Sequence, residues 1–110
     1  MDKYTLEEIT IVAGDYLPLE FEVFDDARSE MASLDGYEVF CAISPFGQND
    51  FVVIEKQGEK IEQGKFIVAI PSNETINLCG KFVYQPVLKA SERHQCRPAQ
   101  GILTILPANI

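Results

Sequence analysis

The sequence predicts an all-β domain, an antiparallel sandwich or barrel of about seven short strands. Two observations carry this prediction. Apolar residues recur with a period of two along most segments, which is typical of half-buried strands rather than of helices. Turn-forming residues separate these segments at short intervals. Because 46% of the 110 residues are hydrophobic, residues 1–110 are expected to form one domain with its own core.

The clearest strand is LPLEFEVF (17–24), in which Leu17, Leu19, Phe21 and Val23 share one face. The other six expected strands, in chain order, are EEITIVA (7–13), GYEVFCAIS (36–44), DFVVIEK (50–56), KFIVAI (65–70), KFVYQPVLK (81–89) and GILTIL (101–106). Within GYEVFCAIS, Cys41 is expected to be a small core residue. Pro86 interrupts KFVYQPVLK and cannot donate to a β-ladder, so we expect a bulge or an edge position near Gln85.

The segments between these strands are predicted to be turns. QGEKIEQG (57–64) is one of them. SNETINL (72–78) offers helix-start residues, with Ser72 or Asn73 as the cap, but it is too short for more than one turn of helix.

The charge balance restricts the possible partners. The chain carries 9 Lys and Arg against 17 Asp and Glu, for a formal net charge of −8. Nucleic acids and anionic membranes select clustered positive charge, so neither is an expected partner. The acidic start MDKYTLEEIT is unlike a signal peptide, and no run approaches the roughly 18 apolar residues of a membrane span. We therefore expect synthesis in the cytoplasm. Three cysteines, an odd number, agree with a reducing compartment.

Residues suited to catalysis are few. His94 is the single histidine, and with Cys96 nearby it falls short of the about four ligands of a zinc site. The adjacent pairs Asp25-Asp26 and Glu7-Glu8 would point to opposite faces of a strand. No nucleophile elbow, phosphate-binding loop or dinucleotide fingerprint is present. The sequence therefore predicts no enzyme, no metal and no cofactor.

A local basic surplus follows the strand that contains Pro86. Lys81, Lys89, Arg93 and Arg97 could face an acidic partner, including the chain's own segment LPLEFEVFDD (17–26), in a head-to-tail contact between subunits. The alternative is a solvated loop.

Several short motifs lie at the entrances of expected strands or within them. They are Gly14-Asp15 before the second strand, Leu34-Asp35-Gly36 before the third, the turn formed by Thr75, Leu78, Gly80, Phe82 and Tyr84 before the penultimate strand, and Gly101-x-Leu103-x-Ile105 in the last strand. In this order they resemble the immunoglobulin-like β-sandwich of tailed-phage baseplate and tail proteins, notably the N-terminal module of the baseplate upper protein family. The resemblance covers nearly the whole chain. In the turn, we expect Gly80 to permit a tight turn that a side chain would obstruct, and Leu78 and Phe82 to close one end of the core.

The resemblance implies a non-enzymatic structural or assembly protein of a phage or prophage tail or baseplate, located in the virion. Such a protein would dock onto itself, as a homo-oligomer, and onto other tail proteins. The predicted interface residues are Phe40, Val83 and Val87, which face outward unless the strand phase is reversed. The alternative is a carbohydrate- or ligand-binding module at a host surface, with Tyr4, Tyr16 and Phe46 as aromatic contacts.

Overall fold

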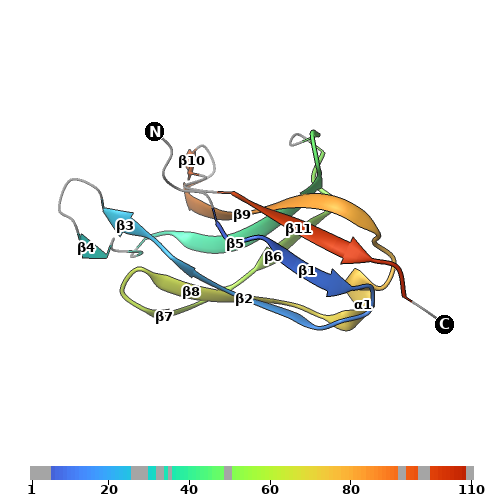
Figure 1. Cartoon of the computed structure of the whole chain (residues 1–110). Helices are drawn as coiled ribbons and strands as arrows, with labels where there is room; N and C mark the ends of the chain where they lie inside the picture. The colour runs from blue at the N-terminus through green and yellow to red at the C-terminus, as the bar shows by residue number, and fades with distance from the viewer. Residues whose placement is uncertain are drawn as a thin grey trace.

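The structure of the protein is a computed structural model that describes residues 6–25, 30–31, 34, 36–48, 51–91, 94–96 and 100–108. Two β-sheets pack face to face, with the larger sheet uppermost in Figure 1. The larger sheet has the order β1-β11-β9-β5-β6, and the smaller sheet has the order β2-β8-β7. This arrangement confirms the predicted all-β sandwich.

The larger sheet consists of β1 (Ile9–Val12), β5 (Glu38–Pro45), β6 (Ile54–Gln57), β9 (Gly80–Ser91) and β11 (Gly101–Leu106), with β10 (His94–Cys96) paired to β9. The smaller sheet consists of β2 (Leu17–Glu22), β7 (Glu59–Glu62) and β8 (Lys65–Ile70). A short separate pair joins β3 (Phe24–Asp25) to β4 (Glu30–Met31), and α1 (Ser72–Thr75) lies between β8 and β9.

The core lies between the two sheets and is built from the residues that the period of two predicts. Along β2, buried and exposed residues alternate strictly, and Phe21 packs against Phe66 of β8 with ring centroids 5.2 Å apart. Cys41 of β5 is fully buried, as predicted. Alternation places every second side chain on the inner face, so the pattern and the core agree. The larger sheet contributes further buried side chains: Val39, Ile43, Phe82, Tyr84, Leu88, Leu103 and Ile105.

One strand pair departs from the antiparallel prediction. β1 runs parallel to β11, with Ile9 opposite Leu103 and Val12 opposite Leu106. A parallel pair needs a long connection between its strands. Here nearly the whole domain lies between β1 and β11, so the connection is available.

The segment 57–64, predicted to be a turn, contains strand β7. β6 pairs with β5 in the larger sheet and β7 pairs with β8 in the smaller one, so the chain changes sheets at Gly58. All four residues of β7 are exposed. A strand exposed on both faces shows no alternation of apolar residues, and the sequence pattern therefore could not reveal it. The predicted strand 50–56 is correspondingly shorter, because β6 begins only at Ile54.

Of the two alternatives expected near Gln85, the bulge is wrong, and the edge position is confirmed on one side of β9. β9 is paired with β5 through Pro86 without a shift of register, and Pro86 lies opposite Cys41. On its other side, β9 pairs with β11 as far as Tyr84 and with β10 from Leu88 onward. Pro86 thus lies where neither strand pairs with β9, so the missing N–H leaves no gap in a ladder on that side.

The single helical turn is confirmed as α1, but its cap differs from the prediction. Pro71 occupies the N-cap position and makes no side-chain capping bond, and Ser72 is already helical. None of the helical residues in the described part of the chain forms a segment with the length and apolar character needed to cross a membrane.

Candidate functional site

The motif residues Gly14, Asp15 and Thr75 meet at one end of the sandwich. The Gly14 N–H donates to the Thr75 hydroxyl oxygen at 3.0 Å, and that hydroxyl donates to the Asp15 carbonyl oxygen at 2.8 Å. The Asp15 carboxylate accepts from the Val12 N–H at 2.9 Å, and the Asp15 N–H donates to the Val12 carbonyl. Thr75 is 1% exposed. These residues join the β1–β2 turn to α1, and they leave no open ligand site between them.

The turns at Leu34 and Gly80 are also structural. Leu34 is buried in the core, its carbonyl accepts from the Tyr37 N–H at 3.1 Å, and Gly36 between them has a φ of +85°. Gly80 has a φ of +114°, and an added Cβ would meet nothing within 4 Å. Gly80 therefore permits the turn as expected, and a side chain there would strain the backbone conformation rather than meet a neighbouring atom. Asp35 lies outside the described residues. Phe82 is a core residue and Leu78 packs against the core, as expected for the turn that precedes β9.

Gly101 and Tyr84 form a second structural contact. They are opposite one another on β11 and β9, and an added Cβ at Gly101 would lie 2.7 Å from the Tyr84 ring. The Tyr84 hydroxyl donates to the Glu7 carbonyl oxygen at 2.6 Å. Burial raises the pKa of Tyr84 to about 12, so the hydroxyl keeps the proton that it donates.

The predicted interface residues Phe40, Val83 and Val87 require a correction. They lie on the outer face of the larger sheet, because the opposite face of β9 carries the core residues. However, Val83 is 3% exposed and Val87 is 0% exposed, so neither offers contact area to a partner. Both are on the central strand β9, and Ala42, Ser44 and Gln85 on the same outer face are also buried. Phe40 is directly opposite Val87. Phe40 itself is half-buried, with the Lys89 ammonium 4.4 Å from its ring.

The exposed apolar side chains gather instead at one end of the sandwich. We define the apolar end as the seven residues Val12, Tyr16, Phe46, Phe51, Val53, Ile76 and Leu106, each between 36% and 60% exposed. They lie where β1, β5 and β11 end and β2, β6 and β9 begin. Figure 1 shows the arrowheads of β1 and β11 beside α1 at this end. Among the described residues, Ile61 of β7 is the one other exposed large hydrophobic.

Local contacts hold the apolar end together. Val12 and Leu106 are opposite one another, and Ile76 lies against Gly14, close enough that an added Cβ there would approach its Cδ1 at 2.8 Å. The Phe46 N–H donates to the Lys81 carbonyl at 3.0 Å, and the Lys81 ammonium is 4.2 Å from the Phe46 ring centroid. The sequence offered a signal for three of these residues, because Tyr16, Phe46 and Ile76 are large apolar residues inside predicted turn segments.

The charged side chains described at the apolar end balance one another. Its charged residues are Asp15, Glu74, Lys56 and Lys81, so its formal charge sums to zero. Lys56 forms an ion pair with Glu74, and the Asp15 carboxylate is held by the Val12 N–H. Lys56 and Glu74 therefore neutralise one another within the molecule.

The outer face of the smaller sheet is acidic by contrast. We call the acidic face the surface formed by Glu20, Glu22, Glu59, Glu62 and Lys65. The Lys65 ammonium is 3.2 Å from the Glu62 carboxylate and 3.8 Å from that of Glu22, which raises the pKa of Lys65. Four carboxylates surround one ammonium, so the face is net negative.

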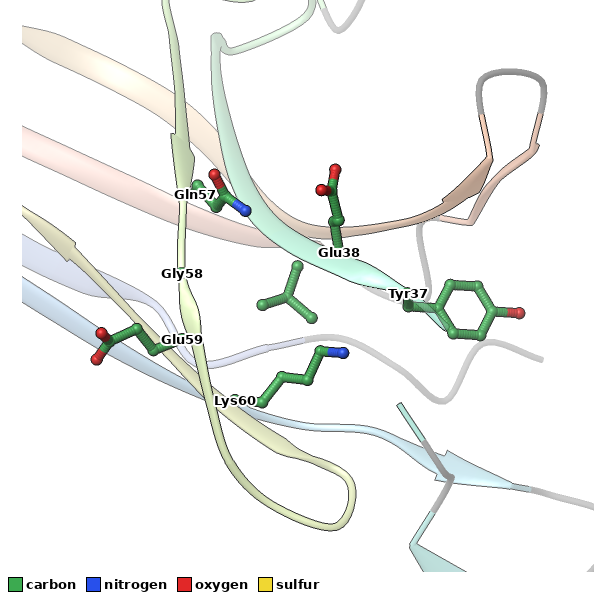
Figure 2. A pocket seen from close by; sticks show the side chains of 7 residues that line it. Tyr37, Glu38, Gln57, Gly58, Glu59 and Lys60 are labelled. Atoms are coloured by element: carbon green, nitrogen blue, oxygen red, sulfur yellow. The ribbon is translucent and has the colours of Figure 1, made fainter. Parts of the chain in front are cut away.

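A pocket opens where the chain crosses from β6 to β7, beside the start of β5 (Figure 2). It has a volume of about 500 Å³ and is lined by Tyr37, Glu38, Val39, Gln57, Gly58, Glu59 and Lys60. Glu59 points away from it in Figure 2, as does the Tyr37 ring. Within the described ranges, no three His, Cys, Asp or Glu side chains are arranged to hold a metal ion.

The other residues that the sequence singled out as candidates for chemistry or binding are located as follows. His94 and Cys96 belong to β10, but their side chains lie outside the described residues, as do Arg93, Arg97 and Tyr4. Cys79 is exposed, and burial raises the pKa of the Cys41 thiol to about 12. No protein-family model and no curated protein sequence matches this chain.

Proposed function

We propose that this chain is a non-enzymatic structural module that assembles by protein–protein docking, and that it belongs to the tail or baseplate of a phage or prophage. The observation that carries the docking proposal is the apolar end. Exposed apolar surface that is gathered in one place, rather than scattered, marks interaction sites on soluble proteins. Aromatic side chains such as Tyr16, Phe46 and Phe51 are also enriched in interfaces.

The chemistry of the buried groups agrees with a structural role. Burial raises the pKa of the Cys41 thiol and of the Tyr84 phenol to about 12, farther from neutral pH rather than toward it. A nucleophilic cysteine needs a lowered pKa and an accessible sulfur, and Cys41 has neither.

The tail or baseplate setting rests on the motif order, and an immunoglobulin-like topology is part of the same proposal. The strand orders support it. In immunoglobulin domains, one sheet contains strands B, E and D in that order, and the other contains G, F and C, to which variable domains add C′. Here β2, β8 and β7 take the places of the first set, and β11, β9, β5 and β6 those of the second.

Particles released from the cells that encode this chain provide the test. We expect the chain to co-purify with tails or baseplates at a fixed copy number, and to be lost from them in an Ile76→Ser Phe51→Ser variant. Glu20→Gln, on the acidic face, is the matched control and should remain bound. If the folded chain were found only in fractions that contain no particles, the tail and baseplate proposal would be overturned.

The pocket favours a second candidate, binding of a carbohydrate or another small polar ligand. Its volume lies within the roughly 300–1,000 Å³ of small-molecule sites. Lys60 supplies an ammonium and Gln57 an amide for hydrogen bonds. Calorimetric titration with oligosaccharides tests this candidate. Binding that is lost in Lys60→Ala and kept in Lys65→Ala would support it, and an absence of binding by the unmodified chain would remove it.

A further inference from the structure

Resting on the proposed docking function, we propose that the apolar end binds a second copy of this chain through the same end, forming a two-fold symmetric dimer. The exposed residues of the apolar end are the contact surface, and Leu106 lies near its centre. Such a dimer is isologous, meaning that both subunits use the same surface, and this is the commonest symmetry of soluble homo-oligomers.

The charge distribution selects this end for self-association. Each copy carries a formal net charge of −8, so two copies repel one another at most orientations. Contact between two acidic faces would place the carboxylates of Glu20, Glu22, Glu59 and Glu62 against their equivalents. The charged side chains described at the apolar end instead sum to zero. A second copy can therefore approach this end while the acidic faces of the two molecules remain far from one another.

The order of the strands adds a complementary contact. β11 lies between β1 and β9, with Leu106 opposite Val12 on one side and Thr104 opposite Lys81 on the other. A two-fold axis close to Leu106 exchanges these two sides. It brings the Lys81 ammonium of one copy toward the Asp15 carboxylate of the other, twice in each dimer, while Leu106 packs against its equivalent.

A competing arrangement is head-to-tail, with Lys81 and Lys89 of one copy on the acidic face of the next. Lys89 is already paired with Glu55 at 3.1 Å and lies over the Phe40 ring. Such a contact would have to replace interactions within the chain. The two arrangements also respond oppositely to salt: screening weakens an ionic head-to-tail contact, whereas it relieves the repulsion that opposes an apolar dimer of acidic subunits.

Sedimentation equilibrium of the purified chain at low and high sodium chloride, over roughly a thousand-fold range of concentration, tests the proposal. We expect reversible association from the 12.3 kDa monomer to twice that mass, with a dissociation constant that falls as salt rises. Leu106→Glu should raise that constant by roughly 30-fold or more, because it places two like charges beside the axis. Ile61→Ser is the matched control: Ile61 is 52% exposed but lies outside the apolar end, so this variant should dimerise normally.

Far-UV circular dichroism and the urea midpoint establish that Leu106→Glu is folded, and Phe46→Ser gives a second, uncharged test of the same surface. A monomer at every concentration and salt would overturn the dimer, as would a dimer that both variants retain or that high salt dissociates. The particle experiment distinguishes these outcomes from failure of the docking function, because a monomer that still enters tails has a different protein as its partner.

Discussion

The backbone N–H of Gly14 donates a 3.0 Å hydrogen bond to the hydroxyl of Thr75, a residue 61 positions later in the chain. The same hydroxyl donates to the Asp15 carbonyl at 2.8 Å. One buried side chain therefore satisfies a donor and an acceptor of the β1–β2 turn. The turn and α1 together support the apolar end, where Ile76 packs against Gly14.

Replacing Thr75 by valine keeps the side-chain volume and removes the hydroxyl. We expect a loss of about 1–3 kcal/mol in the free energy of unfolding, because the Gly14 N–H and the Asp15 carbonyl would lose their partner. Urea unfolding measures the loss. Hydrogen exchange at the Gly14 amide identifies its cause: exchange should accelerate in Thr75→Val but stay slow in Thr75→Ser, which keeps the hydroxyl. Equal protection of Gly14 in both variants would contradict this role for Thr75.

Gly101 and Tyr84 should be energetically coupled. Gly101→Ala would push a Cβ into the Tyr84 ring, displacing the hydroxyl that bonds to the Glu7 carbonyl. We expect each of Gly101→Ala and Tyr84→Phe to destabilise the fold, and the two losses together to be smaller than their sum by roughly 0.5–3 kcal/mol. A double-mutant cycle in urea gives the coupling. Strict additivity would show that the ring accommodates the new methyl group without moving.

Gly58 should tolerate no side chain although its φ is not in the left-handed region. An added Cβ would lie 2.5 Å from the Ile67 carbonyl oxygen and 2.6 Å from a Val68 methyl. Backbone cannot move aside as a flexible side chain can, so Gly58→Ala should cost about 1–3 kcal/mol. The neighbouring exposed change Gln57→Ala is the control, with an expected effect within about 0.5 kcal/mol. Similar urea midpoints for the two variants would contradict a steric clash at Gly58.

Stability should fall under alkaline conditions. Burial raises the pKa of Cys41 from 9.0 and that of Tyr84 from 10.0, each to about 12. The folded chain thus holds protons that the unfolded chain releases, so this contribution is complete below pH 9 and is lost as the pH rises toward 12. Urea unfolding from pH 8 upward measures the slope. In Cys41→Ala, the free energy of unfolding should fall less steeply between pH 9 and 10. An unchanged slope in that range would assign the effect to other groups.

Much of the core follows from the sequence alone. The inward faces of β2, β5, β8 and β9 were predicted by alternation, because a strand packed on one side requires apolar residues at every second position. The predictions failed where that constraint is weak. β7 is exposed on both faces, and Val83 and Val87 are buried on a face that alternation marks as exposed.

The sequence by itself thus determined the fold class, the residues that face the core, and the glycine that permits the tight turn before β9. The alternation of apolar residues and the positions of turn residues reflect only residues that are close along the chain. The tertiary structure alone decided which distant segments meet: Thr75 with Gly14, Gly101 with Tyr84, and Val12 with Leu106. The apolar end belongs to this second class. Its members come from segments spread between residues 12 and 106, and only the order of strands within the two packed sheets brings them to one surface.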